Sequence, residues 1–274
     1  MEDPTASGFA DVDLRWDTED LFVGELGPDS FYLFDRMLEA TLDQVASRDA
    51  IGPWFGGRVL DIACGAGGDV AQLVPSGWQA HGLEPSDTML SLARDRNASA
   101  EEQVVLARGI AEALPYADET FDRVMCKGSF DHFARPRQAM EEIRRVLKPQ
   151  GRFVMSIANF ESLSCRMGRS LYPVIRATNP DFRNGSRPYW VIPRDHTFKG
   201  DLPTTIRLAT GILELESYRG VSLMWAFPYW VAMLKAMPDR LSALSLRLAN
   251  RMGRQHPSQS DVIVASWRKP ADPA

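Results

Sequence analysis

Short aliphatic runs alternate with amphipathic stretches through the middle of the chain. Five of these runs are predicted to be strands: Arg58–Ile62, Gln79–Leu83, Gln103–Ala107, Phe121–Cys126 and Arg152–Ile157. Runs that are apolar at most positions are typical of strands buried on both faces of a sheet. Between them, apolar residues recur at helical spacing, so the pattern predicts repeated β–α units. Such units build a parallel sheet with helices on both faces.

Further elements are predicted on either side of this core. The apolar spacing of Ser30–Ser47 predicts a helix that covers the sheet. The segment Phe160–Gly200 contains four prolines, which predicts an irregular lobe outside the sheet. After the lobe, the pattern predicts strands at Ile212–Ser217 and Asp261–Trp267, with helices at Tyr229–Met237 and Arg240–Met252 between them.

The last of these helices combines apolar and basic positions. Its apolar residues recur at helical spacing (Leu241, Leu244, Leu248, Met252), and its arginines lie elsewhere (Arg240, Arg247, Arg251, with Arg254 just beyond). We expect the apolar residues to face the core and the arginines to face solvent. Peripheral contact with a membrane is the alternative interpretation of the same pattern.

The composition is that of an ordinary globular protein. Of 274 residues, 45% are hydrophobic and 24% are charged. The formal charge of −5 argues against a general nucleic-acid-binding protein, which needs a dominant basic surface. The charge is uneven, however. Residues 1–57 carry thirteen acidic and three basic side chains, whereas residues 160–200 carry seven basic and three acidic ones. The lobe could therefore attract one anionic small molecule.

The cysteines and the amino-terminal residues indicate the cellular compartment in which the protein is expected. The three cysteines, Cys64, Cys126 and Cys165, have no CxxC spacing, so neither a disulfide framework nor a zinc knuckle is indicated. The acidic first residues lack the basic and apolar regions of a signal peptide. We therefore expect a cytoplasmic protein without a transmembrane segment.

A glycine-rich turn follows the first predicted strand. Gly65 and Gly67 let the backbone turn sharply and let a ligand lie against it. Val70 stands where a dinucleotide-binding fingerprint has its third glycine. Asp61 at the strand end repels a pyrophosphate but attracts a cationic group. Glu84, which ends the second predicted strand, can accept hydrogen bonds from both hydroxyls of a ribose. The turn favours a positively charged nucleoside without phosphates.

Four segments carry a family resemblance: VLDIACGAGG (Val59–Gly68), HGLEPSDTML (His81–Leu90), GIAEALPYADETFDRVMCKGSFDHF (Gly109–Phe133) and LKPQGRFVMSIAN (Leu147–Asn159). In this order they resemble class I S-adenosylmethionine-dependent methyltransferases, in the group that includes ubiquinone/menaquinone-type and other small-molecule enzymes. The resemblance implies an α/β, Rossmann-like, seven-stranded, mostly parallel sheet with helices on both faces. It also implies an amino-terminal helical cover, an inserted lobe over the substrate, and the cofactor S-adenosyl-L-methionine.

The same resemblance implies cofactor contacts by position. Asp61, Ala63, Gly65 and Gly67 would hold the methionine part, and Glu84 would bind the ribose diol. Pro85, Ser86 and Met89 would flank the adenine, Ile110, Ala111 and Glu112 would meet its edge, and Lys127 would lie beside the sulfonium. Ala63 stands where the family often has glycine, and Ile110 stands where the family commonly has an acidic residue.

Three residues are candidates for removing a proton from an acceptor. His132 follows the fourth strand together with Asp131, and an imidazole titrates near neutrality. Asp131 can orient His132 only if their side chains meet. His196, in the lobe, is a second and separate candidate. His132 can equally be structural, and for His196 the interpretation as an ordinary histidine of a proline-rich surface loop is favoured over catalysis. No metal site is predicted, because the four histidines (His81, His132, His196, His256) show no ligand spacing.

The sequence thus predicts four parts: 1–57, an acidic segment with a cover helix; 58–159, the cofactor-binding core; 160–205, the basic lobe; and 206–274, the completion of the sheet. The implied function is in-line methyl transfer from S-adenosylmethionine to a small organic acceptor, either anionic or hydrophobic. A non-catalytic nucleoside-binding or scaffold protein is the alternative. An NAD-dependent oxidoreductase is disfavoured by Val70 and Asp61. The sequence leaves membrane contact and oligomeric state open.

Overall fold

Seven strands form one sheet in the computed structural model, which describes residues 28–47, 57–100, 104–183 and 188–271. The strands are β1 (Arg58–Ile62), β2 (Gln79–Glu84), β3 (Val104–Arg108), β4 (Phe121–Lys127), β5 (Leu147–Ala158), β6 (Glu214–Val221) and β7 (Val262–Arg268). All seven predicted strands are confirmed, while Gln103, the predicted start of β3, lies outside the described residues. The predicted α/β fold class is confirmed as well.

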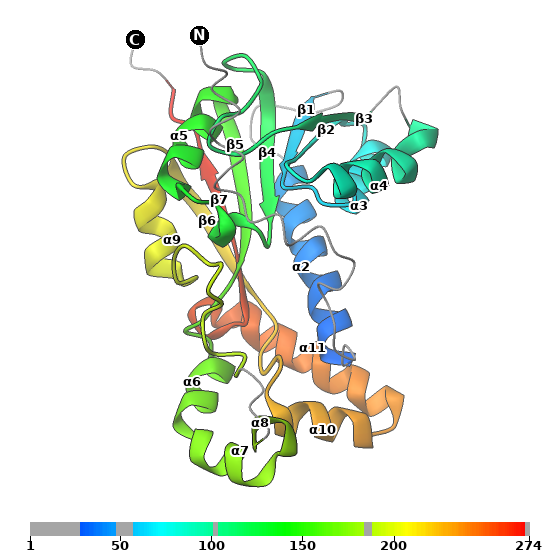
Figure 1. The fold of residues 1–274 in the computed structure, drawn as a ribbon, viewed down its shortest axis with the longest axis vertical. Helices are drawn as coiled ribbons and strands as arrows, with labels where there is room; N and C mark the ends of the chain where they lie inside the picture. Colours follow the sequence, from blue (N-terminus) through cyan, green and yellow to red (C-terminus); the bar gives the residue numbers. More distant parts are fainter. Residues whose placement is uncertain (1–27, 48–56, 101–103, 184–187, 272–274) are drawn as a thin grey trace.

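The strand order across the sheet is β3-β2-β1-β4-β5-β7-β6 (Figure 1). Neighbouring strands from β3 to β5 are parallel, whereas β7 runs antiparallel to both β5 and β6. The chain moves outward from β1 to β3 and then returns to place β4 on the other side of β1. Ligands of such sheets bind beyond the carboxyl ends of the strands at this reversal. The fold therefore predicts a ligand site at the loops after β1 and β4.

Helices cover both faces of the sheet, as predicted. The covering helices are α2 (Pro28–Ala46), α3 (Gly68–Leu73), α4 (Asp87–Asn97), α5 (Pro136–Val146) and α9 (Leu202–Ala209). On one face, Met140 of α5 packs in the same cluster as Phe153 of β5. On the other face, Met37 of α2 packs with Val154 of β5. Adjacent residues of β5 thus enter opposite cores, which explains why its central run Phe153–Met155 is apolar.

The lobe is helical where an irregular structure was predicted. It contains α6 (Leu163–Ser170), α7 (Tyr172–Thr178) and α8 (Pro180–Arg183). Pro173 lies in the first turn of α7 and Pro180 begins α8. Proline is tolerated there because the first N–H groups of a helix have no partner within it. The prolines therefore mark helix starts, and the prediction of an irregular segment was wrong for this half of the lobe.

A small aromatic core joins the lobe to a later part of the chain. Cys165, Ile175 and Trp190 pack against Phe227, which precedes α10 (Pro228–Ala236). A Cβ atom at Gly168 would lie 2.2 Å from the ring of Trp190, so the indole fits only over a residue without a side chain. The lobe is consequently built from two segments that are separated by α9 and β6.

The outer helix α11 (Asp239–Gln255) turns its apolar face outward. The residues predicted to face the core, Leu241, Leu244, Leu248 and Met252, are each 51–52% exposed. Small residues and one leucine are buried instead: Ser242, Leu246, Ala249 and Gly253. A Cβ atom at Gly253 would lie 2.4 Å from the backbone oxygen of Ser222, so the helix packs closely through its small face. The prediction was wrong for this helix. None of the described helices is long and apolar enough to cross a membrane.

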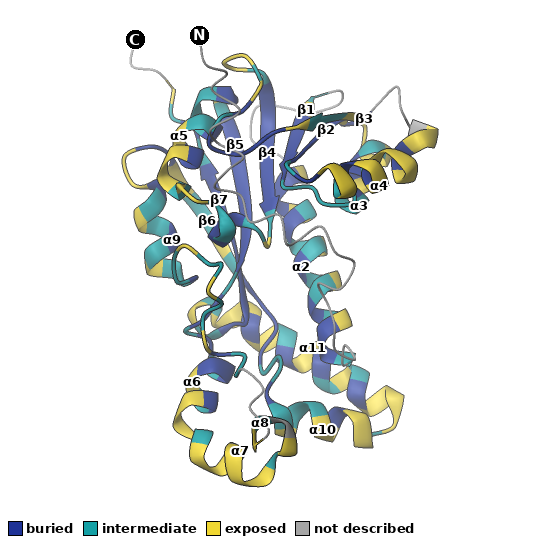
Figure 2. Ribbon diagram, viewed as in Figure 1, coloured by how far each residue is buried: buried dark blue, intermediate teal, exposed yellow. Residues whose placement is uncertain are grey.

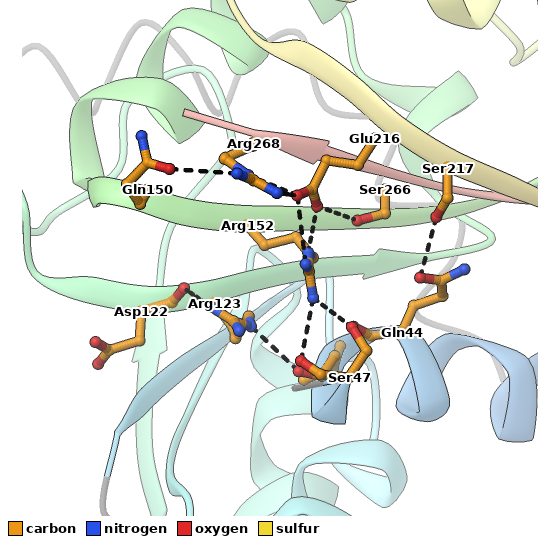
Figure 3. Close-up of polar contacts among 11 residues, drawn as sticks. Gln44, Ser47, Asp122, Arg123, Gln150, Arg152, Glu216, Ser217, Ser266 and Arg268 are labelled. Atoms are coloured by element: carbon orange, nitrogen blue, oxygen red, sulfur yellow. Dashed lines mark hydrogen bonds and ion pairs between the residues drawn. The ribbon is translucent and has the colours of Figure 1, made fainter. Parts of the chain in front are cut away.

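Two buried arginines bind the carboxyl end of α2. Nε of Arg123 donates to the carbonyl oxygen of Val45 at 3.2 Å, and Nη1 of Arg152 donates to the carbonyl oxygen of Ser47 at 3.2 Å. Glu216 of β6 pairs with Arg152 and also with Arg268 of β7 (Figure 3). Cations at this end of a helix satisfy its last carbonyl groups and complement its dipole.

We expect Glu216→Ala to lower the free energy of unfolding at neutral pH by about 3 kcal/mol, because Arg152 stays buried without its carboxylate partner. Burial opposes ionisation of Glu216, but hydrogen bonds from Arg152 and Arg268 outweigh it and lower the pKa of Glu216. This contribution is present above the ordinary pKa of a glutamate and is lost as the pH falls through the lowered value. Urea unfolding at neutral and acidic pH measures the difference.

Glu214→Ala is the matched control, because Glu214 is exposed on the same strand. It should change the free energy of unfolding by less than about 0.5 kcal/mol. Equal losses in the two variants would contradict a special role for Glu216.

Candidate active site

The turn after β1 places three of five residues in the left-handed region. Ala63, Gly65 and Gly67 have φ angles of 57°, 53° and 68°. This conformation costs a residue with a Cβ atom roughly 1 kcal/mol, so Ala63 adopts it at a cost that glycine avoids. A Cβ atom at Gly65 would meet nothing within 4 Å, whereas one at Gly67 would lie 2.7 Å from Nδ2 of Asn97. Gly65 thus borders open space, and Gly67 permits close packing on α4.

Glu84 connects the end of β2 to this turn. One carboxylate oxygen accepts a hydrogen bond from the backbone N–H of Gly65 at 2.9 Å, and the other accepts one from Ser86 N–H at 3.1 Å. A carboxylate can accept about four hydrogen bonds, which suits contact with a ribose diol. Its carboxylate is buried and fixed at the edge of the turn.

Three carboxylates and one ammonium group gather at the same edge. Nζ of Lys127, the last residue of β4, lies 2.8 Å from Oδ2 of Asp69. Burial and the neighbouring Asp69 raise the pKa of Asp61, the charge of Lys127 opposes this rise, and Glu84 adds to it. A bound cation relieves such repulsion. The buried carboxylates and the open space beside Gly65 therefore fit a positively charged nucleoside such as S-adenosylmethionine.

Other predicted cofactor residues have local roles in the structure. The hydroxyl of Ser86 accepts a hydrogen bond from the N–H of Met89 at 3.2 Å and so caps α4. A carboxylate oxygen of Glu112 accepts one from the N–H of Arg135 at 3.1 Å, directly before α5. Pro85 and Met89 are half-buried, whereas Ile110 and Ala111 are buried. No pattern in the sequence indicated the contact between Glu112 and Arg135.

The three candidate catalytic residues come together, but in an unexpected pairing. Oδ2 of Asp131 lies 2.9 Å from Nδ1 of His196, and Nδ1 of His132 lies 3.4 Å from Oδ2 of Asp195. The two imidazole rings meet edge to face, with centroids 4.5 Å apart. Asp131 therefore pairs with the distant histidine rather than with its neighbour in sequence. Asp195 was not predicted as a site residue, and only its place beside His196 could have suggested it.

A hydrogen-bonded connection holds the lobe against the loop after β4. The backbone N–H of Thr197 donates to the carbonyl oxygen of Asp131 at 2.8 Å, and its hydroxyl donates to the carbonyl oxygen of Phe133 at 2.8 Å. Phe160 meets the ring of His196 edge to face at 5.5 Å. His196 consequently has a fixed position beside His132.

The local environment keeps His132 neutral near physiological pH. Burial lowers the pKa of His132, and His196 contributes in the same direction, although Asp131 and Asp195 oppose them. A neutral imidazole next to a carboxylate suits proton removal. Asp131, His132 and His196 also place one potential metal-ligand atom each within 4.8 Å of one another, a proximity that sequence spacing did not reveal.

Comparison with known proteins gives the family context. Residues 60–155 match the model of a family described as a methyltransferase domain. The chain is 29% identical over 231 residues to a demethylmenaquinone methyltransferase of Clavibacter sepedonicus, covering 83% of this chain and 80% of that protein. It is 33% identical over 146 residues to the ubiquinone/menaquinone biosynthesis C-methyltransferase UbiE of Geobacter sulfurreducens, covering 50% of this chain and 56% of that protein.

A solved structure shares the fold. The PH0226 protein from Pyrococcus horikoshii OT3 is 21% identical to this chain and superposes with a TM-score of 0.56. The superposition covers 94% of both chains. The fold similarity therefore includes the regions outside the matched domain.

The two glycines of the turn should respond differently to alanine. We expect Gly65→Ala to weaken S-adenosylhomocysteine binding at least tenfold at a stability cost of about 1 kcal/mol, because its methyl group enters only the open space. Gly67→Ala should instead cost about 3 kcal/mol of stability, because its methyl group would also collide with Asn97 and Ala93. Calorimetry and urea unfolding measure the two effects. The same profile in both variants would mean that Gly65 does not border the ligand.

Proposed function

We propose residue roles and an acceptor class from one premise: this chain is a class I S-adenosylmethionine-dependent methyltransferase. Its substrate is a small molecule, and its methyl donor is S-adenosylmethionine. The arrangement of buried carboxylates around an open glycine turn carries the proposal for donor binding. The facing histidines carry the proposal for proton removal.

The donor would lie across the turn after β1. Glu84 would accept hydrogen bonds from the ribose hydroxyls, and Asp61 would attract the cationic methionine end. Pro85 and Met89, at the start of α4, would flank the adenine, with Ile110 and Ala111 at its edge. When bound, the donor supplies an electrophilic methyl group on a positively charged sulfur. Lys127, whose charge is balanced by Asp69, would limit repulsion of that sulfur.

His132 would remove a proton from the acceptor, with His196 and Asp131 beside it. A paired base contributes about 10²–10⁴-fold to such reactions. Asp195 would orient His132, while Asp131 would hold His196. The lobe would exclude water from the reacting groups, since its Thr197 joins the loop that carries both Asp131 and His132.

We favour an apolar, quinone-like acceptor over an anionic one. Phe160 lies against His196, and Phe133 packs near the same loop. Two cations of the basic lobe, Arg169 and Lys199, are already paired with Glu161. The named relatives are methyltransferases of menaquinone and ubiquinone biosynthesis, which supports the same acceptor class. A molecule of that kind is dissolved in a membrane, so we expect peripheral membrane contact.

Glu84→Gln should weaken S-adenosylhomocysteine binding between about ten- and a hundredfold, because the variant loses charge-assisted hydrogen bonds to the ribose. Asp87→Asn is the control, since the Asp87 carboxylate lies outside on α4 and pairs with Arg108. Isothermal calorimetry compares both variants with the wild type. Unchanged affinity of Glu84→Gln would reject the proposed donor site.

The rate of methyl transfer should rise with pH and reach half of its maximum below pH 6.5, the ordinary pKa of histidine, because the base must be neutral and burial lowers the pKa of His132. His132→Asn should reduce kcat by about a hundredfold or more and remove this rise, with donor affinity retained. His256→Asn, at an exposed histidine, is the control. Transfer of an isotopically labelled methyl group to short-chain quinols measures the rate. Full activity of His132→Asn would exclude it as the base.

A further inference from the structure

Three helices, α7, α10 and α11, lie at the end of the molecule far from β1, β2 and β3 (Figure 1). α10 packs against both α11 and α2. The hydroxyl groups of Thr178 at the end of α7 and Tyr229 of α10 are hydrogen-bonded at 2.6 Å. We name the exposed residues of α7, α10 and α11 the distal surface. Its helices α7 and α10 belong to the lobe that carries His196, and α11 packs against α10.

Large apolar side chains are exposed on all three helices of the distal surface, and Figure 2 shows exposed residues along each of them. α11 contributes its whole apolar stripe, α10 contributes Tyr229 and Met233, and α7 contributes Val174, which is 54% exposed. Single exposed apolar residues are ordinary, but a contiguous set on neighbouring helices marks a contact surface. The stripe of α11 is not needed for the core, because the helix packs through its opposite, small-residue side.

Basic residues accompany the apolar ones. Residues 228–255 contain five basic side chains and one acidic side chain, although the whole chain carries a charge of −5. Arg240, Arg247, Arg251 and Arg254 are all exposed on α11. On a helical projection these arginines lie along one flank of the stripe Leu241–Met252. The helix thus presents an apolar face with a basic border, which is typical of interfacial helices.

We propose that the distal surface docks the enzyme onto an anionic lipid bilayer, with α11 lying in the plane of the interface. The inference rests on the proposed function in one respect, namely that an apolar acceptor is reached from the membrane. Leu244 and Leu248 enter the boundary between headgroups and acyl chains. The arginines lie at the level of the anionic headgroups, where each contributes attraction.

The charge distribution favours a bilayer over a second copy of the chain. Pairing two distal surfaces through the stripe would bring two rows of arginines into proximity, and like charges at an interface oppose association. Anionic headgroups instead neutralise the arginines while the acyl region takes up the leucines. The surface is therefore complementary to a phospholipid layer.

Sedimentation with vesicles tests this proposal on the full chain. The wild type should bind vesicles of phosphatidylglycerol and phosphatidylcholine, bind far more weakly to phosphatidylcholine alone, and be released by high salt. The double variant Leu244→Glu/Leu248→Glu and the double variant Arg247→Ser/Arg251→Ser should each weaken partitioning by roughly tenfold or more. Leu92→Glu is the matched control, because Leu92 is an exposed leucine on α4 at the opposite end of the molecule.

Two further measurements separate the possible results. Calorimetry with S-adenosylhomocysteine shows whether each variant is folded and whether the donor site exists. Wild-type protein that binds this ligand but not the anionic vesicles overturns the docking proposal and leaves the proposed function standing. Sedimentation velocity shows whether a dimer dissociates in the leucine variant. A wild-type dimer that this variant converts to monomer, without any vesicle binding, assigns the surface to self-association and also overturns the proposal.

Discussion

The position of the lobe relative to the sheet depends on α2, whose two ends are held by buried polar contacts. At its carboxyl end, Arg123 and Arg152 bind the last carbonyl groups. At its amino end, the carboxylate of Asp29 accepts a hydrogen bond from the N–H of Ala226, and Ser30 accepts one from the indole of Trp225. Nineteen residues span about 28 Å, so the helix joins the amino edge of the sheet to the lobe beyond the opposite edge. Buried charges tolerate little displacement, which fixes this distance.

Burial shifts the pKa values of the two halves of the candidate site in opposite directions. At the turn after β1, burial and the neighbouring Asp69 raise the pKa of Asp61, and a cationic ligand would offset this excess of negative charge. Beside β4, burial lowers the pKa of His132, which leaves a neutral imidazole at physiological pH. One edge of the sheet thus holds an environment that would favour a positively charged donor and another that would favour a neutral imidazole.

The lobe lies between the paired histidines and the distal surface. Its inner side carries His196 and Asp195, which lie beside Asp131 and His132. Its outer side contributes α7 and α10 to the distal surface. Trp190 stabilises the inner segment by packing on Gly168 and Phe182. α10 joins the aromatic core through Trp230 and packs against both α2 and α11. A molecule bound at the distal surface would therefore lie against the unit that contains the lobe. This arrangement suits an acceptor that is poorly soluble in water.

The sequence alone determined the strands, the glycine turn after β1 and Glu84 at the end of β2. These features are local, since a buried parallel strand is apolar throughout and a left-handed turn requires small residues. Only the tertiary structure decided that Asp131 pairs with His196, because the two residues are distant in sequence and meet through the hydrogen bonds of Thr197. It also decided which side of α11 is buried. Helical periodicity identifies an apolar stripe, but the close approach to the backbone of Ser222 selects the face with glycine and alanine, and the leucines remain outside.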